Sequence, residues 1–318
     1  MRTLAFALLA LVSTAAGAQM SVQEYALPSR ITAHDVWADP APDGPVWFSG
    51  QGSGNAGRLD PKTGKVELIP LGSGSSPHGV ILDRDGSAWF TDGGQNAIVR
   101  VDANTRELKK WPLPKDSGYT NLNTAIFDRA GIHWFTGQSG IYGRLDPKSG
   151  DLKVYSAPKG RGPYGIHSTP DGTVYFASLA GSYVGRIDAA THKVQVIEPP
   201  TKDQGARRVW SDSKGMVWVA EWNSGNLSRY DPKSNAWKTW RAPGERPRVY
   251  AVYVDETDKV WISEWDKQLM MRFDPASEKW DSHSSSSGSA NVRQIHGRKG
   301  EVWTPESAAG KLVVYRYR

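Results

Sequence analysis

Cysteine is absent from all 318 residues of this sequence, which excludes disulfide bonds, thiolate nucleophiles and cysteine metal ligands. After the first twenty residues there is no long helical pattern, and no segment is apolar enough to cross a bilayer. Lysine and arginine form no dense run, although the formal net charge is +6. Dispersed charge of this kind is typical of a solvated surface and does not favour a nucleic-acid site. The remaining short apolar runs, broken by 33 glycines and 20 prolines, predict an all-β protein.

The first eighteen residues have the pattern of a secretory signal. Met1-Arg2 gives a positive start, residues 4–12 are apolar, and Ala16-Gly17-Ala18 is a small-residue cleavage site. We therefore expect cleavage before Gln19, a periplasmic or secreted protein, and a single domain over residues 19–318. An uncleaved anchor is the alternative, which the shortness of the apolar run disfavours.

One short motif, an aromatic residue inside an apolar strand as in VWFSG or SAWFTD, recurs through the whole chain at intervals of 41 to 45 residues. Its seven aromatic anchors are Trp47, Trp89, Trp134, Tyr175, Trp218, Trp261 and Trp303. An Arg-apolar-Asp motif follows six of them, for example Arg58-Leu59-Asp60 and Arg100-Val101-Asp102. A period of about 40–45 residues built from short strands is the pattern of propeller blades with four strands each. The sequence predicts a seven-bladed β-propeller.

The two ends of the chain are expected to meet in one blade. The last repeat stops near Tyr315, before any outer strand, whereas residues 22–28 resemble the outer strands of other repeats. We predict that this N-terminal strand closes the last blade, because an open ring would leave two exposed strand edges. A ring that covers its own edges is expected to be a monomer.

Strand geometry predicts which residues share one mouth of the central channel. The inner strand runs along the channel and the next strand returns, so the residue that enters the first and the residue that leaves the second lie on the same face. The entry ring consists of His34, His78, Asn123, Tyr164, Arg207, Tyr250 and Arg293. The exit ring consists of Gly50, Asp92, Gly137, Ser178, Glu221, Glu264 and Glu306.

The motifs Pro77-His78-Gly79-Val80, Trp89-Phe90-Thr91-Asp92 and Pro163-Tyr164-Gly165-Ile166 resemble the repeats of the streptogramin B (virginiamycin B) lyase family, and the resemblance covers all seven repeats. It implies a seven-bladed propeller that opens a cyclic depsipeptide ester by elimination, with Mg2+ and without water. In that family a His entering the last blade is the base. A Glu two residues before it and a Glu after the last anchor help to hold the metal, and a second His enters the sixth blade.

Several of these positions carry other residues in this chain. The last-blade His position falls on Arg293, the Glu before it on Asn291, and the sixth-blade His on Tyr250, or on Arg248 with a shifted alignment. Arginine is not an ordinary base, because its pKa exceeds about 12. Glu306 remains as the expected carboxylate ligand of Mg2+.

Two classes of function follow from the mouth residues. The first is a lyase-like enzyme with Glu264 and Glu306 as carboxylates and Arg248 and Arg293 as anion stabilisers. Either His34 or His78 would then be its base or a metal ligand, unless these histidines are structural. The second is a non-catalytic propeller that binds a small molecule, a glycan or a partner protein at the same mouth. A requirement for a divalent ion would favour the enzyme.

The other expected ligand-binding residues are Asn123, Tyr164, Arg207, Arg208, Glu221 and Tyr250, together with Trp222 and Trp265, which follow exit glutamates and could stack on a ring-shaped ligand. Two alternatives stay open from the sequence. The glutamates and arginines could neutralise one another as a ring of salt bridges, and the two tryptophans could pack against neighbouring blades instead.

Overall fold

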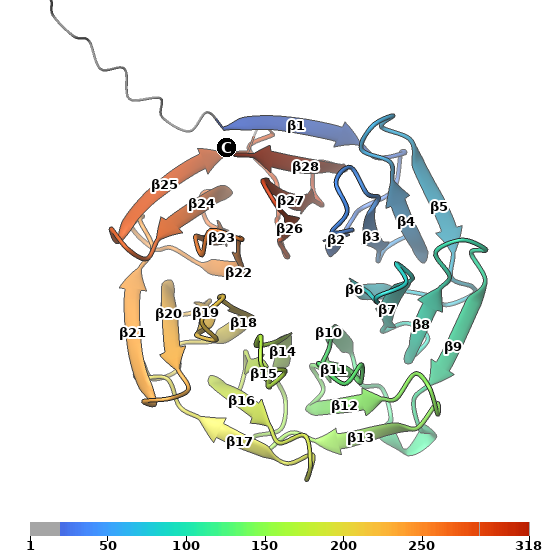
Figure 1. Ribbon diagram of the computed structural model, residues 1–318, viewed down its shortest axis with the longest axis horizontal. Coiled ribbons are helices and arrows are strands. Elements are labelled where there is room, and N and C mark those ends of the chain that lie inside the picture. The colour runs from blue at the N-terminus through green and yellow to red at the C-terminus, as the bar shows by residue number, and fades with distance from the viewer. Residues whose placement is uncertain (1–19, 286, 318) are drawn as a thin grey trace, which may run out of the picture.

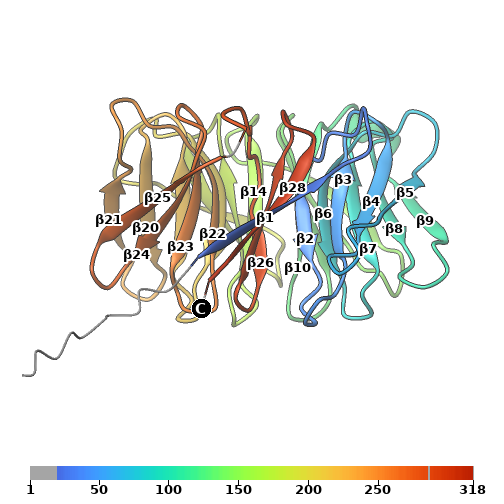
Figure 2. The same cartoon turned by 90° about the horizontal axis from the view of Figure 1, so that it is seen from above.

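The computed structural model describes residues 20–285 and 287–317. The predicted signal segment, residues 1–18, lies outside the described residues. Seven four-stranded antiparallel sheets stand around a central axis, which confirms the seven-bladed propeller (Figure 1). Seen from the side, the ring has its connecting loops on two opposite faces (Figure 2).

From the axis outward, the first three blades are β2 (Val36–Ala38), β3 (Val46–Gly50), β4 (Asn55–Leu59) and β5 (Val66–Pro70); β6 (Pro77–Leu82), β7 (Ala88–Asp92), β8 (Ala97–Val101) and β9 (Leu108–Pro112); and β10 (Leu122–Phe127), β11 (His133–Gly137), β12 (Ile141–Leu145) and β13 (Leu152–Ser156). The next three are β14 (Pro163–Ser168), β15 (Val174–Ser178), β16 (Tyr183–Ile187) and β17 (Val194–Ile197); β18 (Ala206–Ser211), β19 (Val217–Glu221), β20 (Asn226–Asp231) and β21 (Ala236–Arg241); and β22 (Val249–Val254), β23 (Val260–Glu264), β24 (Leu269–Asp274) and β25 (Lys279–Ser284). The seventh is β26 (His296–Arg298), β27 (Glu301–Glu306), β28 (Lys311–Arg316) and β1 (Ser21–Ala26).

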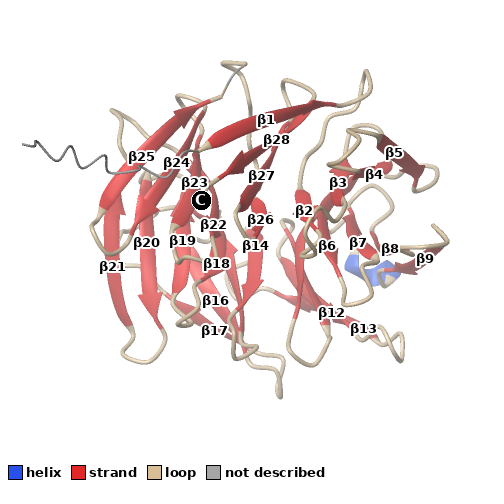
Figure 3. Cartoon of the chain, turned by 45° about the horizontal axis from the view of Figure 1, so that its top comes forward, coloured by secondary structure: helices blue, strands red, loops and turns tan. Residues whose placement is uncertain are grey.

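Helix is almost absent from the described chain, where a single 3-10 turn, η1 (Lys115–Ser117), interrupts the strands (Figure 3). No helix among the described residues is long and apolar enough to cross a membrane.

The N-terminal strand closes the ring as predicted. β1 pairs antiparallel with β28 in a register that sets Ser21 opposite Arg316 and Ala26 opposite Lys311. Within this pair Tyr25 is 6% exposed and stacks on the anchor Trp303, with 5.5 Å between ring centroids. Its hydroxyl donates to the carbonyl of Pro61 in the first blade, 2.9 Å away. The two chain ends therefore join one sheet and also fasten it to the neighbouring blade.

The two repeated sequence motifs meet inside each blade. In six blades the motif arginine lies directly opposite the aromatic anchor of the adjacent strand, as Arg58 lies opposite Trp47 and Arg229 opposite Trp218. The Arg229 guanidinium lies over the Trp218 ring at 5.5 Å from its centroid. In such a cation–π contact the arginine stem covers the buried aromatic ring while the guanidinium stays in contact with water, which explains why the pair recurs.

The aspartate that ends the second motif begins the turn before the outer strand. Its carboxylate accepts from the backbone N–H two residues later, at 2.9 Å for Asp60, Asp146 and Asp231 alike. At the end of these turns Gly64 and Gly150 have φ of 71° and 77°, a conformation that costs glycine little. These aspartates are therefore turn formers, as the sequence predicts.

Removal of the Tyr25 side chain tests the closure. We expect Tyr25→Ala to lower the free energy of unfolding by about 3–5 kcal/mol, because a large buried aromatic ring is lost from the seam. The matched control is Val22→Ala on the same strand, where the side chain is 53% exposed and the change should stay within about 0.5 kcal/mol. Urea denaturation measures both, and equal stability of the two variants would contradict a structural role for the seam.

Candidate functional site

Bulges in the inner strands place the entry ring at one end of the channel. In β6, Pro77 pairs with Asp92 and Val80 with Phe90, so His78 and Gly79 together face Thr91. The inner strands of four further blades show the same two-against-one irregularity at their entry positions. A bulge bends its strand and redirects a side chain, and bulges recur next to functional sites. The pairing also sets the entry and exit rings on the same face, as predicted.

Hydroxyl groups of the second strands hold the bulged backbone of the next blade. Ser49 Oγ donates to the carbonyl of His78 at 2.5 Å. Thr91 and Thr136 donate in the same way to the carbonyls of Asn123 and Tyr164. Sequence reasoning missed this role, although its signal was present in the recurring Trp-Phe-Ser/Thr. Each entry residue held in this way is fixed by the blade before it.

A buried charge chain begins at His34 in the entry ring and crosses the channel to Arg208 in the fifth blade. His34 Nδ1 lies 2.9 Å from Asp35 Oδ1, and Arg208 reaches both Asp35 oxygens at 3.0 and 3.3 Å. Burial opposes the ionisation of Asp35, but the Arg208 guanidinium and His34 outweigh it and hold the carboxyl pKa well below its usual range. Asp35 therefore stays ionised and fixes the His34 ring through Nδ1. Asp35 was missed from the sequence, because nothing local indicated that its partner lies in the fifth blade.

His34 is neutral near pH 7 and offers a free nitrogen. Burial lowers its pKa below 6.5, although the Asp35 carboxylate opposes the shift. With Nδ1–H donating to Asp35, Nε2 has a lone pair and makes no hydrogen bond within residues 20–285 and 287–317. The side chain keeps 10% of its surface exposed. This arrangement of carboxylate, imidazole and open nitrogen is that of an oriented general base.

His78 packs beside His34, with 4.0 Å between the ring centroids. Its Nε2 lies 3.1 Å from Asn123 Nδ2, which can only donate, so Nε2 accepts and Nδ1 carries the proton. Burial lowers the pKa of His78 well below its ordinary value, and Nδ1 has no partner among the described residues. His78 is thus a neutral wall of the mouth.

His34, Asp35 and His78 could also hold a metal ion, because one ligand atom from each lies within 4.8 Å of the others. Asp35, however, already accepts from both His34 and Arg208. A divalent ion would have to lie against the Arg208 guanidinium and displace the His34 hydrogen bond. The present contacts favour an oriented base over a metal site.

Aromatic rings and arginines alternate along the opposite side of the mouth and form an arginine–aromatic cluster. Its members are Tyr164, Arg207, Trp222, Arg248, Tyr250, Trp265 and Arg293. Arg207 lies 3.5 Å above the Tyr250 ring and donates to the Tyr164 hydroxyl at 3.2 Å, and the Tyr164 and Tyr250 hydroxyls lie 2.6 Å apart. Arg248 covers Trp222 at 5.0 Å and Arg293 covers Trp265 at 5.1 Å.

Trp222 and Trp265 pack within this cluster and remain partly exposed at the mouth. The sequence left open whether these tryptophans pack against neighbouring blades or stack on a ligand. Each ring contacts the next blade and still has exposed surface at the mouth, so both are compatible with its position.

The exit-ring glutamates accept hydrogen bonds from neutral groups of the loops around the mouth. Glu221 accepts from Ser224, Asn226 and Ser228. Glu264 accepts from the backbone N–H groups of Arg248, Asp266 and Lys267. Glu306 accepts from the hydroxyls of Ser285 and Ser287 at 2.8 and 2.9 Å.

No salt bridge joins these glutamates to Arg207, Arg248 or Arg293 in the described part of the chain. The ring of salt bridges that the sequence left open as an alternative is therefore not formed, and among the mouth arginines Arg208 alone has a carboxylate partner there, Asp35. Three guanidinium charges at the mouth are left without a carboxylate. That excess favours an anionic ligand.

Comparisons with known proteins agree with this architecture. The sequence model described as the Virginiamycin B lyase family matches residues 14–239. This chain belongs to the virginiamycin B lyase family. A search of curated proteins found no match.

Solved structures with the same fold include a streptogramin B lyase, with a TM-score of 0.85, 20% identity and coverage of 94% of this chain and 98% of the other. The virginiamycin B lyase from Staphylococcus aureus in selenomethionine form has a TM-score of 0.85, 19% identity and coverage of 94% and 99%. Its catalytically inactive histidine-to-alanine variant, solved with quinupristin, gives 0.84 at 19% identity and the same coverage. At these identities the likeness shows the fold.

The metal expected from the virginiamycin B lyase family does not fit the residues at the corresponding positions. Mg2+ prefers a near-octahedral set of oxygen ligands. Here Glu306 is the one carboxylate, and both its oxygens accept serine hydrogen bonds. The guanidinium of Arg293 donates to Ser307 Oγ and to the carbonyl of Asn291, so a fixed cation stands where ligands would be needed.

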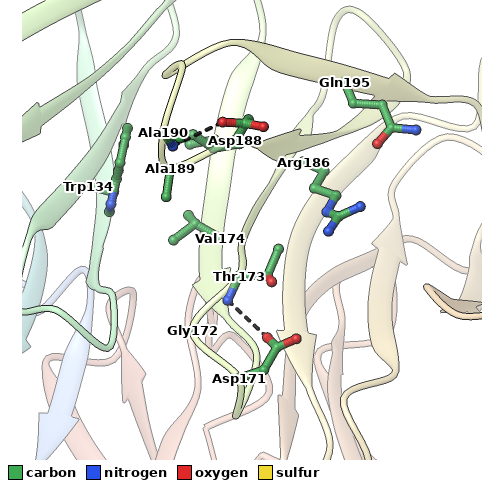
Figure 4. Close-up of a pocket in the computed structure, with 11 residues that line it drawn as sticks. Trp134, Asp171, Gly172, Thr173, Val174, Arg186, Asp188, Ala189, Ala190 and Gln195 are labelled. Atoms are coloured by element: carbon green, nitrogen blue, oxygen red, sulfur yellow. Dashed lines mark hydrogen bonds between the residues drawn. The ribbon is translucent and has the colours of Figure 1, made fainter.

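Another cavity of this virginiamycin B lyase family member lies away from the entry ring. It has a volume of about 480 Å³, lies between the third and fourth blades and is lined by Trp134, Asp171, Arg186 and Asp188 among others (Figure 4). Its two aspartates accept from backbone N–H groups of their own turns, at Thr173 and Ala190. Those contacts are turn structure and give the groove no catalytic arrangement.

The charge chain gives a stability prediction. We expect Asp35→Asn to lower the free energy of unfolding by about 3–5 kcal/mol, because it leaves the buried Arg208 guanidinium without its carboxylate. Asp85→Asn is the matched control, since the Asp85 side chain is 61% exposed and pairs with Arg100 at the surface, where a pair contributes less than about 1 kcal/mol. Urea denaturation at pH 7 compares the two variants. Similar losses of stability would show that removing the Asp35 carboxylate does not leave a costly unpaired charge on Arg208.

Proposed function

We propose that this protein is a carbon–oxygen lyase that acts on an anionic or carbonyl-bearing substrate at the entry mouth, with His34 as its general base. The observation that supports this most is the His34–Asp35–Arg208 chain, which keeps His34 neutral, oriented and open at Nε2. In the last blade, this chain has Arg293 in place of the histidine of the family. The His34–Asp35–Arg208 chain supplies a base on the first blade instead.

The reaction is a β-elimination. His34 Nε2 takes the proton on the carbon next to a carbonyl or carboxylate group, and the released electron pair forms a carbon–carbon double bond. The carbon–oxygen bond on the next carbon breaks, and its electrons leave with the oxygen. The proton held by His34 then returns to that leaving oxygen, so that no water is consumed.

The arginine–aromatic cluster stabilises the negative charge that develops on the carbonyl oxygen. Arg207, Arg248 and Arg293 lack carboxylate partners among the described residues, so their charge is available to a substrate. Donors that are already fixed in position need no reorganisation as charge develops. Partly exposed Trp222 and Trp265 offer surface for a ring of the substrate.

The first test uses quinupristin and an oligouronate as probe substrates, analysed by mass spectrometry. Elimination opens the cyclic ester of quinupristin without a change of mass, whereas hydrolysis gives a product one water heavier. For the oligouronate, the two fragments of an elimination sum to the mass of the substrate, whereas those of hydrolysis sum to one water more. We expect His34→Gln to reduce kcat/KM by about 10²–10⁴-fold, the usual contribution of a general base. His283→Gln, on the outer strand β25, is the control and should keep full activity.

Acidity and chelation separate this proposal from its alternatives. Burial holds the pKa of His34 below 6.5, so the imidazole is neutral above pH 7 and kcat/KM should not change with pH there. At lower pH, protonation of His34 removes the base, and kcat/KM should fall as the pH drops through the pKa of His34. EDTA should leave the rate unchanged, and a rate abolished by EDTA would overturn the metal-free mechanism. Saturable binding of the probes without turnover would instead support the non-catalytic propeller.

We also infer export of the chain, supported by the charged start, apolar segment and Ala16-Gly17-Ala18 site of residues 1–18. Expression with the complete N-terminus in a Gram-negative host should give a periplasmic protein that begins at Gln19. Intact-mass measurement of the periplasmic and membrane fractions checks this. Recovery of the full-length chain in the membrane fraction would favour the uncleaved anchor.

A further inference from the structure

The end of the channel opposite the entry ring has an aromatic floor. Three positions after each entry residue lies a second ring of side chains: Trp37, Ile81, Ile126, His167, Trp210, Tyr253 and His296. Trp37 stacks on His296 and His167 on Trp210, with 3.8 and 3.9 Å between ring centroids. Trp37 and Trp210 approach each other at 6.4 Å. These rings close the channel from below.

The two ends of the channel are separate. Between them lies an internal cavity of about 20 Å³, lined by Asp35, Arg208 and the aromatic floor. Such a volume has room for about one water molecule. A ligand at the lower end is therefore separated from His34 Nε2 by the aromatic floor and by this small cavity.

A cavity of about 1010 Å³ opens below this floor, across the first, second, third and seventh blades. Its apolar surface includes Trp37, Leu82 and Phe127. Known ligand pockets span about 300–1,000 Å³ and combine an apolar wall with a few polar groups. The cavity is at the upper end of that range and has the apolar wall.

The acidic residues around this cavity are already paired, whereas most of the described basic residues are free to bind a ligand. The acidic residues are occupied: Asp83 accepts from Trp89 Nε1 at 2.7 Å, Asp128 accepts from Trp134 Nε1 at 2.8 Å, and Asp85 pairs with Arg100.

The basic residues are mostly available. Arg84, Lys148 and Lys299 line the cavity, are exposed and make no salt bridge within the described residues. Arg298 is the exception, because it pairs with Glu301 and donates to three backbone carbonyls. The unpaired charge at the rim is therefore positive.

We propose that this lower cavity is a second binding site, for a small molecule with fused or linked aromatic rings and a carboxylate or similar anionic group. The rings would lie against Trp37 and Phe127, and the anion would face Lys148 and Lys299. The inference is independent of the proposed lyase function, because it rests on residues at the other end of the channel.

The test uses 2-naphthoate as probe and 2-naphthamide as its uncharged counterpart, with equilibrium dialysis against residues 19–318. We expect one saturable 2-naphthoate site per chain. Lys148→Ser with Lys299→Ser should weaken it by about five- to tenfold, since two charge-assisted contacts are lost. The same double variant should leave 2-naphthamide binding unchanged, whereas Trp37→Ala should weaken both probes.

The matched control is Lys202→Ser with Lys214→Ser, which removes the same charge. Lys214 lies four residues before the anchor Trp218 of the fifth blade, as Lys299 lies four before the anchor Trp303 of the seventh, but it does not line this cavity. An equal loss in this control would show a general charge effect and overturn the site. Unsaturable binding, or a loss caused by Arg248→Ser at the entry mouth, would overturn it as well.

Discussion

Closure of the ring is the constraint on which the rest of this structure depends. A propeller blade has two sheet edges, and the seventh blade is complete only when β1 from the start of the chain pairs with β28 from its end. Antiparallel pairing satisfies the backbone groups of both ends, and Tyr25 then fastens the closed blade to Trp303 and to the first blade. Every residue of the channel depends on this closure for its neighbours.

Inside the closed ring, the charge chain acts as a brace across the channel. Asp35 belongs to the first blade and Arg208 to the fifth, 173 residues further along. Burial opposes the charge of the Asp35 carboxylate, but Arg208 and His34 keep it ionised, so that it can orient His34. The same pair lies between the entry mouth and the aromatic floor. One interaction therefore positions the proposed base and separates the two ends of the channel.

At both ends of the channel, the hydrogen-bond partners of the carboxylates determine which charges remain unpaired. At the entry mouth, the glutamates accept hydrogen bonds from loop hydroxyl and N–H groups and leave Arg207, Arg248 and Arg293 without a carboxylate partner among the described residues. At the lower end, aspartates bind tryptophan Nε1 groups and leave lysines free. In both places neutral donors, which are hydroxyl, backbone N–H and indole N–H groups, occupy the carboxylate oxygens. The result is an excess of positive charge at both openings.

The sequence by itself determined the seven blades, their turns, the closing strand and the membership of the entry ring. These follow from local periodicity: an anchor every 41 to 45 residues, an Arg-apolar-Asp partner and turn residues whose conformations are set by their own chemistry. Because the blades repeat, equivalent positions could be assigned to one mouth by counting from Trp89 or Trp261.

Only the tertiary structure decided which charged side chains meet. Spacing could not show that Arg208 pairs with Asp35 while Arg207 stacks on Tyr250, since the bulge in β18 sends adjacent residues to different partners. Nor could it show that Glu306 accepts from Ser285 and not from Arg293. Partner choice across a channel depends on the closed geometry of all seven blades, whereas strand pattern depends on neighbouring residues alone.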